Sequence, residues 1–467
     1  MHKIPWKEKL SYGFGATGLD LSYGLFYSYL SIYLTNVLGV KSLFLLILAP
    51  LARLWDGIND PMMGVIVDRT NTKWGKRRPW ILAGAALNAV VLCLLFNNPL
   101  RQGSVGLYVY VAVFYVLWGM TNTLADIPYW SMVPSFTSSE KERNTISTVA
   151  RTFSGAGQGI IALGTPIALK LLGDGTNDNV NAQGFGRIAV IASAFLVIFA
   201  FLSVLGTKER RIVKSTESFS FKKAVANIKS NDQLLVFMLF AMISNAGYYM
   251  TSGISSYYFT AVKGDIGLQS TFNLYGSVGS VLSILVVPVF SRFLSNRGIY
   301  KLCLLTAIAG YAGMGVAGLG FDAGPTVLGA FYFIASIGIG SMFVNQTIML
   351  SDVVDYGEYR SGKRNEALTF SMKGFLQKMA YTFQSVIMYA AFLLTKYNGL
   401  ENAGAAANPA AQRAISLLMF VVPPVMLAIS LFVFLTKYKV FGKLKEDVIE
   451  AINRKYDQME TKGSEEG

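Results

Sequence analysis

The chain has 467 residues, of which 53% are hydrophobic and only 15% are charged, and its mean hydropathy is +0.44. Soluble domains carry about 25% charged residues, so the roughly three soluble domains that the length suggests are excluded. The only histidine is His2, and Cys93 and Cys303 lie in apolar runs, which excludes histidine catalysis, a disulfide scaffold and a cysteine zinc site. The net charge of +14 can indicate nucleic acid, anionic lipid or an acidic substrate.

Twelve apolar runs are long enough to cross a bilayer as helices, which need about 20 residues each. The strands of a membrane barrel would be about ten residues long and would alternate in polarity. We therefore expect an all-α integral membrane protein with twelve transmembrane helices. The expected spans are 12–38, 43–67, 79–98, 106–135, 145–173, 186–206, 233–260, 267–290, 299–320, 325–351, 367–396 and 411–436.

The longest polar connection separates six spans from the other six, which is typical of transporters built from two bundles. We expect an N-terminal six-helix bundle at 1–206, a cytoplasmic middle loop at 207–232, a C-terminal six-helix bundle at 233–440 and a cytoplasmic tail at 441–467. The charged start runs directly into the first span, which predicts that no signal peptide is present.

Lys and Arg are distributed unevenly between the two sides of the expected membrane. With both termini in the cytoplasm, 30 basic residues fall on the cytoplasmic side, 7 outside and 4 within spans. Because cytoplasmic loops are enriched in Lys and Arg, this asymmetry predicts a multi-pass protein of the cytoplasmic membrane with both termini inside. The net positive charge then reflects membrane topology, and it requires no nucleic-acid partner.

Charged residues within the spans are functional candidates, because a charge at the bilayer centre costs about 3 kcal/mol on insertion scales. The acids within spans all lie in the N-terminal half: Asp20, Asp56, Asp60 and Asp126. The bases placed well inside the spans, away from their ends, are Arg53, Arg151, Lys373 and Lys378. We expect Lys378 to reach the acids across the bundle interface, whereas Lys373 can extend toward the cytoplasmic surface.

In the second span, Arg53, Asp56 and Asp60 share one face at positions i, i+3 and i+7, and Asn59 lies beside both acids. Two carboxylates within one turn repel each other, and a bound cation or proton removes that repulsion. Carboxylate, amide and hydroxyl oxygens suit a hard ion such as sodium. The alternative for Arg53 is a structural ion pair with one acid. We predict cation or proton binding at Asp56 and Asp60.

In the fourth span, Asn122, Asp126 and Trp130 share a face, and Thr123 lies three residues before Asp126. A carboxylate beside an indole is a common way to hold a sugar, because the acid accepts hydrogen bonds from adjacent hydroxyls while the ring covers an apolar sugar face. This face therefore predicts a sugar-binding surface.

The first and fifth spans supply further candidates. Asp20 shares a face with Tyr27 in the first span. Arg151, in the fifth span, can donate to a carboxylate and a hydroxyl together. The alternative is a buried Asp–Arg pair that only holds helices together, but two acids and one Arg among aromatic residues favour a binding site.

Several long segments resemble one known family. The run LARLWDGINDPMMG followed by RTNTKWGKRRPWI resembles the second helix and following loop of the glycoside–pentoside–hexuronide:cation symporters, which belong to the major facilitator superfamily. LSYGFGATGLD, LWGMTNTLADIPYWSMVP and SDVVDYGEY are similar to the melibiose permease branch, and the similarity runs from about Leu10 to past Leu435. The resemblance implies a major facilitator fold and symport of a galactoside or disaccharide such as melibiose with Na⁺, Li⁺ or H⁺ by alternating access.

The resemblance also assigns roles to individual residues. It places the cation site at Asp56, Asn59, Asp60 and Thr123, with sodium held by Asp56, Asp60 and Thr123. It places the sugar site at Asp20, Tyr27, Asn122, Asp126, Trp130, Arg151 and Phe343. It gives Lys378 a coupling role, which we extend to Arg53, and it implies a cytoplasmic gate of Arg143, Asp352, Asp355 and Glu358. Leu19, Asn122 and Phe343 stand where the melibiose branch has a lysine, a tyrosine and a tryptophan, and these departures all lie on the sugar side.

The alternatives concern the substrate and the direction of transport. Another glycoside, a pentoside or a hexuronide would fit the same family. A proton-driven drug exporter would explain the buried acids, but it predicts a wide apolar cavity without the hydroxyl-binding groups Asp20, Asp126 and Arg151. The sequence carries no cofactor motif and no enzymatic constellation. We expect a monomer whose partners are a glycoside, a monovalent cation and membrane lipids, with no nucleic acid.

Overall fold

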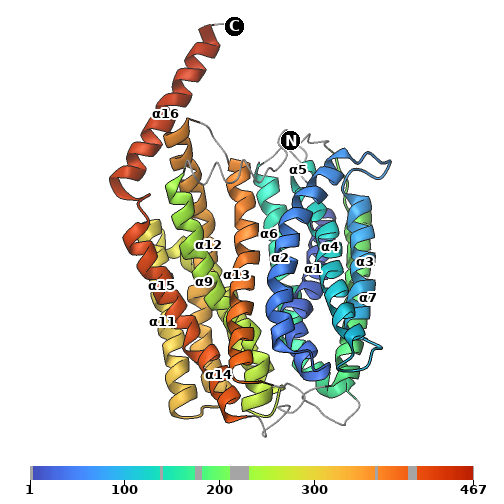
Figure 1. The fold of residues 1–467 in the computed structure, drawn as a ribbon. Coiled ribbons are helices and arrows are strands. Elements are labelled where there is room, and N and C mark those ends of the chain that lie inside the picture. Colours follow the sequence, from blue (N-terminus) through green and yellow to red (C-terminus); the bar gives the residue numbers. More distant parts are fainter. Residues whose placement is uncertain are drawn as a thin grey trace. The chain divides into compact units, whose positions relative to one another are not determined.

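A computed structural model describes residues 4–136, 140–173, 181–210, 231–362, 366–397 and 408–465, and this part of the chain is predominantly helical. The N-terminal half holds α1 (Trp6–Ile32), α2 (Ser42–Arg69), α3 (Arg78–Phe96), α4 (Val105–Ser131), α5 (Val133–Phe136), α6 (Glu140–Leu172) and α7 (Ala182–Gly206) (Figure 1). The C-terminal half holds α9 (Asp232–Tyr257), α10 (Leu268–Phe290), α11 (Asn296–Gly315), α12 (Pro325–Ser361), α13 (Glu366–Leu394), α14 (Pro409–Phe420), α15 (Val422–Lys437) and α16 (Gly442–Glu465). Each expected span coincides with one long helix or with consecutive helical segments.

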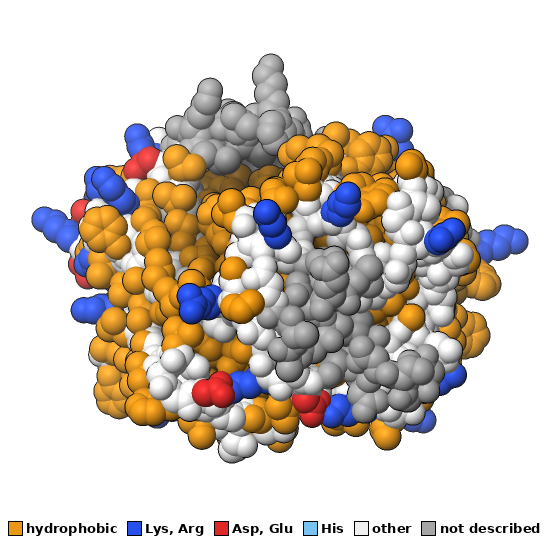
Figure 2. Space-filling model, turned by 60° about the horizontal axis from the view of Figure 1, so that its bottom comes forward, with side chains coloured by type: hydrophobic (Ala, Val, Ile, Leu, Met, Phe, Trp, Pro, Cys, Tyr) orange, Lys and Arg blue, Asp and Glu red, His pale blue; other side chains and the backbone are white. Residues whose placement is uncertain are grey.

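The described helices have the length and the surface of membrane helices. Nine segments of the described chain are long and apolar enough to cross a bilayer. On α2, one face exposes a stripe of large apolar side chains: Leu43, Ile47, Leu51, Leu54 and Ile58. The opposite face buries Arg53 and Asp56, so polarity is inverted relative to a soluble protein. Figure 2 shows apolar side chains over much of the visible face, with few charges between them.

The chain packs as two compact units. Unit 1 comprises Met1–Ser218, Ser252–Asn273 and Ser385–Ser416, and unit 2 comprises Phe219–Thr251, Leu274–Gln384 and Leu417–Gly467. The division between the units passes through α9, α10, α13 and α14, so parts of these helices pack with the N-terminal half. The bundle boundaries expected from the polar connection stay a prediction.

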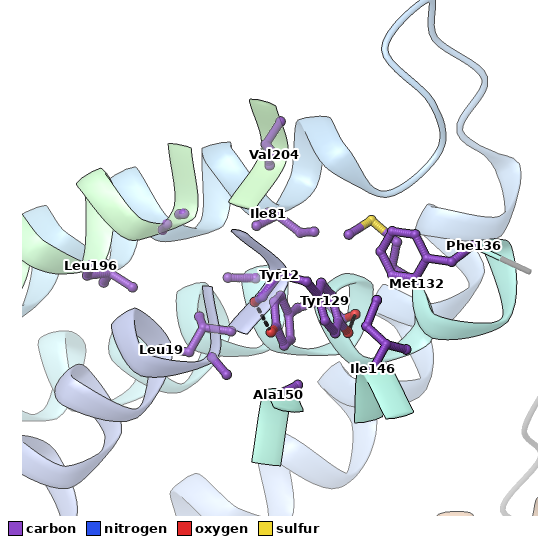
Figure 3. Packing of buried hydrophobic residues seen from close by; sticks show 14 of the residues in the cluster. Tyr12, Leu19, Ile81, Tyr129, Met132, Phe136, Ile146, Ala150, Leu196 and Val204 are labelled. Carbon is purple, nitrogen blue, oxygen red and sulfur yellow. Dashed lines mark hydrogen bonds between the residues drawn. The ribbon is translucent and has the colours of Figure 1, made fainter. Parts of the chain in front are cut away.

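The core of unit 1 is centred on α1. This helix packs against α6 and α7, while α3 packs against α4 and α7. The rings of Tyr12 on α1 and Tyr129 on α4 stack at 4.3 Å between centroids, and each hydroxyl donates to the backbone carbonyl of the other residue, at 2.7 and 2.5 Å (Figure 3). Buried hydroxyls that are satisfied in this way fix the two helices in register, and Trp130 is the next residue along α4.

The ends of α1 and α9, which both lie in unit 1, have the same unusual geometry. The π-helical turn η1 (Tyr33–Val37) follows α1, and η2 (Tyr258–Val262) follows α9. The amides after each turn donate back to the carbonyls at its start, and each chain then turns at a glycine with positive φ, Gly39 at 64° and Gly264 at 73°. Only glycine adopts this conformation without strain. The segments YLTNVLG and YFTAVKG therefore end their helices with the same turn geometry.

The basic loop between α2 and α3 is held by an acid from far along the sequence. The carboxylate of Glu209 accepts backbone N–H bonds from Lys76, Arg77 and Arg78, at 2.9 to 3.2 Å, where α3 begins. The side chain of Arg77 is buried and donates to the hydroxyl of Ser135 at 2.6 Å. Part of the positive charge of this loop therefore has a structural role.

In unit 2, α11 packs against α12 and α15, and α16 packs against α12. A buried polar cluster lies within it: the amide nitrogen of Gln346 reaches Ser244, Asn245 and Tyr300 at 3.2 to 3.3 Å. All of these groups are neutral, and their contacts with one another account for this burial of polar atoms.

Candidate functional site

The two acids of α2, Asp56 and Asp60, have different partners. Arg53 and Asp56 form a buried ion pair at 2.6 Å, because positions i and i+3 lie on one helix face. Asp60, one turn further on, accepts a hydrogen bond at 2.9 Å from the hydroxyl of Thr123 on α4. The predicted ion pair is therefore present. Asp60 and Thr123 are also in contact, as predicted, so α2 and α4 meet at this point.

Asn59 completes the polar surface of α2. Its amide nitrogen is buried and has no hydrogen-bond partner among the described residues, which costs about 1–3 kcal/mol. In the part of the chain that the structure describes, no three His, Cys, Asp or Glu residues gather as a metal site would require. A cation at this point would therefore be held by two carboxylates together with amide and hydroxyl oxygens, and this donor set suits a hard monovalent ion.

The predicted sugar face of α4 forms a layered arrangement. The indole N–H of Trp130 donates to the carboxylate of Asp126 at 2.9 Å. The guanidinium of Arg151, from α6, lies over the same ring at 3.9 Å from its centroid. An acid, an aromatic ring and an exposed guanidinium thus come together from two helices. Acceptors, donors and an apolar face of this kind are the groups that bind a sugar.

Asp20 on α1 faces α6 as well. Its carboxylate accepts a hydrogen bond at 2.7 Å from the amide of Gln158. Gln158 was not among the predicted residues, although its spacing of seven positions after Arg151 places both side chains on one face of α6. That spacing is the signal that could have indicated it.

Tyr27, which was also predicted for the sugar site, lies beside Arg53 of α2. The guanidinium of Arg53 lies 4.8 Å from the centre of its ring, and the ring of Tyr23 lies 4.2 Å away. Tyr27 therefore borders the ion pair of α2. Asn122 is half-buried on α4, one turn before Asp126.

The residues predicted for the sugar site and for coupling include two in unit 2. Phe343 on α12 packs edge-on against Tyr248 at 5.6 Å, and Tyr249 stacks on Tyr381 at 3.5 Å beside it. Lys378 is half-buried on α13. The structure therefore gives Phe343 an aromatic surrounding, while its role toward a sugar and the coupling role of Lys378 stay predictions.

The predicted cytoplasmic gate has a partner in the tail. Asp352 on α12 forms an ion pair with Lys445 of α16 at 2.7 Å, and it accepts a hydrogen bond from Asn296 at 3.3 Å. Asp355 and Glu358 follow on the same helix, and Glu358 is buried. Arg143, the predicted basic partner, lies on α6 in unit 1, so this gate stays a prediction.

Comparison with known proteins identifies the family of this chain. Residues 11–440 match the model of a family described as MFS/sugar transport protein. The lactose permease of Lactobacillus delbrueckii subsp. bulgaricus is 26% identical over 97% of this chain and 73% of its own length. The isoprimeverose transporter of Lactiplantibacillus pentosus is 28% identical over 81% of this chain and 78% of its own. The uncharacterised symporter YjmB of Bacillus subtilis is 26% identical over 97% and 96%.

A solved structure shows the same fold. A bacterial homologue of the human lysosomal transporter Spinster, in an inward-facing and unoccupied conformation, covers 94% of this chain and 98% of its own, with a TM-score of 0.68 and 14% identity. At this identity the likeness concerns the fold alone. The expected all-α membrane fold of the major facilitator type is confirmed. The chain therefore belongs to the MFS/sugar transport protein family, within the glycoside–pentoside–hexuronide:cation symporters, and it is a transporter rather than an enzyme.

Proposed function

We propose that this protein carries a glycoside across the cytoplasmic membrane together with a monovalent cation, Na⁺, Li⁺ or H⁺. The observation that supports this most directly is the hydrogen bond between Asp60 and Thr123. It links the acid pair of α2 to α4, and Asp126 follows Thr123 by three residues on that helix. The proposed cation site and the proposed sugar site therefore share one rigid element.

Coupling follows from this shared helix. A cation at Asp56, Asn59, Asp60 and Thr123 compensates the charge of Asp60 and orders α4, which holds Asp126 and Trp130 in the geometry that a sugar requires. By thermodynamic linkage, a bound sugar must then favour cation binding by the same factor. One charge moving across about 100 mV supplies about 2.3 kcal/mol, and a tenfold cation gradient adds about 1.4 kcal/mol. Together they support accumulation of several hundredfold.

Alternating access supplies the movement. Within unit 1, the end of α1 is joined to segments from the C-terminal half by single hydroxyl contacts: Ser31 to Tyr389 at 2.8 Å, Thr35 to Tyr257 at 2.9 Å and Asn36 to Tyr397 at 3.0 Å. A half-exposed ion pair, Lys170 to Asp265 at 2.6 Å, adds to them. Contacts of this kind contribute about 1 kcal/mol or less each, so they can break and re-form during a transport cycle.

A galactoside is the first substrate to test. The proposed sugar residues are Asp20, Tyr27, Asn122, Asp126, Trp130, Arg151 and Phe343. The named relatives include a lactose permease and an isoprimeverose transporter, so galactosides and pentose-containing glycosides both belong in the panel. We also propose that both termini face the cytoplasm, as the distribution of Lys and Arg indicates.

Uptake into proteoliposomes tests the proposal. Purified full-length protein is reconstituted, and uptake of radiolabelled lactose, melibiose, a xyloside and a glucoside is measured with an inward gradient of sodium, of lithium or of protons, and without a gradient. We expect at least one sugar to accumulate only when one of these gradients is present. Uptake that no cation gradient alters would refute coupling, and failure to carry any glycoside would refute the proposed function.

A further inference from the structure

The carboxylate of Asp20 is held by neutral groups. Gln158 donates its amide N–H to this carboxylate at 2.7 Å, and Ser154, one turn earlier on α6, is a second neutral side chain that stabilises its charge. Asp126 and Arg151 are charged side chains that act on Asp20 electrostatically. When ionised, these two acids and one base carry a net charge of −1.

The backbone holds Asp20 and Gln158 together before any ligand arrives. Gly157 allows α6 to touch α1, because a Cβ atom there would lie 2.7 Å from the carbonyl oxygen of Thr17 and 3.2 Å from the Cβ of Asp20. The hydroxyl of Thr17 donates to the carbonyl of Phe153 at 3.0 Å and fastens the same crossing. The acid–amide pair is therefore built into the helix contact, and a ligand does not have to recruit the amide.

The residue before Asp20 provides no polar group beside the acid. Leu19 is 6% exposed and packs in the core cluster around Tyr12, as Figure 3 shows. Gln158, in contrast, is exposed, and within the described chain its carbonyl Oε1 has no hydrogen-bond partner. The second polar group beside Asp20 thus comes from α6, and it is an uncharged amide.

From this geometry we infer that Gln158 is a specificity-determining residue that makes the transporter select neutral glycosides over hexuronides. The inference rests on the proposed function. One of the two amide N–H groups is used by Asp20, so the pair presents two hydrogen-bond acceptors, a carboxylate oxygen and the Oε1 atom of Gln158, against one remaining N–H donor. Sugar hydroxyls can donate to both. A uronate carboxylate has no proton to donate at neutral pH, and the net negative charge of Asp20, Asp126 and Arg151 repels it.

Matched sugar pairs in proteoliposomes test the inference. Uptake and competition are measured for a galactoside and its galacturonide, and for a glucoside and its glucuronide, in the presence of sodium, lithium or a proton gradient. The variants are Gln158→Ala, which removes the amide, and Gln158→Lys, which places a cation beside Asp20. Gln183→Lys is the control, because Gln183 is an exposed glutamine at the start of α7 that bonds Arg187 instead of an acid.

We expect the parent protein to prefer the neutral sugar of each pair by at least about tenfold. Gln158→Ala should weaken neutral-sugar affinity roughly 10- to 100-fold, and Gln158→Lys should raise the ratio of uronide to neutral sugar at least about tenfold, while Gln183→Lys leaves it unchanged. The cation concentration for half-maximal uptake should stay unchanged in Gln158→Ala, which separates sugar recognition from general damage.

The two ways of failing are distinct. Equal transport of uronide and neutral sugar by the parent protein, or an unchanged ratio in Gln158→Lys, would overturn the inference and leave cation-coupled sugar transport intact. Failure of the parent protein to carry any sugar of either class would refute the proposed function, and the inference with it.

Discussion

The hydrogen bond from Thr123 to Asp60 provides the sharpest test of coupling. Thr123→Ala removes the hydroxyl that lies 2.9 Å from the carboxylate and leaves the rest of α4 unchanged. A hydrogen bond to a charged group contributes about 1.5–3 kcal/mol. The cation concentration at half-saturation should therefore rise by roughly 10- to 100-fold.

Linkage makes the prediction specific to the cation. Sugar affinity measured at saturating cation should change by less than about twofold, because Asp126 and Trp130 keep their contact at 2.9 Å. The assay is calorimetric titration of a galactoside into purified protein in nanodiscs at a series of sodium, lithium and proton concentrations. The cation that shifts the sugar affinity of the parent protein is then used for the variant.

Thr123→Ser is the matched control. It keeps the hydroxyl and removes only a methyl group from a side chain that is 4% exposed. We expect it to restore the parent cation affinity to within a few-fold. If the serine variant were as impaired as the alanine variant, methyl packing would be responsible instead of the hydrogen bond. An equal loss of sugar affinity at saturating cation would likewise refute the division into two linked sites.

Three further predictions address other parts of the molecule. Trp130→Phe keeps an aromatic ring but loses the donor to Asp126, so the sugar dissociation constant should rise about tenfold with unchanged cation affinity; equal sugar affinities by calorimetry would contradict this. Glu209→Ala leaves three backbone N–H groups at the start of α3 without their acceptor. The free energy of unfolding should fall by about 2 kcal/mol, which is measured as a lower Tm with sugar affinity retained. An unchanged Tm would show that this carboxylate is not needed for stability. Tyr257→Phe removes the hydroxyl contact with Thr35, which contributes about 1 kcal/mol, and should speed amide hydrogen exchange at the end of α1. Protection equal to that of the parent protein would show that this contact does not hold the end of α1 in place.

Contacts within one helix were the part of the candidate site that spacing could predict. Arg53 and Asp56 are three residues apart, and Asp126 and Trp130 are four apart, so a helix of 3.6 residues per turn brings each pair together. Contacts between helices required more. Spacing alone could not pair Asp60 with Thr123, 63 positions later, and that prediction depended on the resemblance to a known family.

Some features of the site were revealed neither by helical spacing nor by the family resemblance. Gln158 reaches Asp20 across 138 positions, and neither spacing between helices nor the resemblance indicated it. The ring of Tyr27, which was predicted for the sugar site, lies against Arg53, and its role toward a sugar stays a prediction. Leu19 turns into the core, although it precedes Asp20 directly.

The sequence by itself determined that this is a membrane protein of long apolar helices with its buried acids in one half, because composition and helical period depend only on local chemistry. The tertiary structure alone decided which side chain each acid meets. That choice depends on how closely two helices approach and how each is rotated, and residues such as Gly157, which lets α6 touch α1 beside Asp20, control both. The long-range hydrogen bond from Gln158 to Asp20, and with it the inferred preference for neutral sugars, could be recognised only after this packing was known.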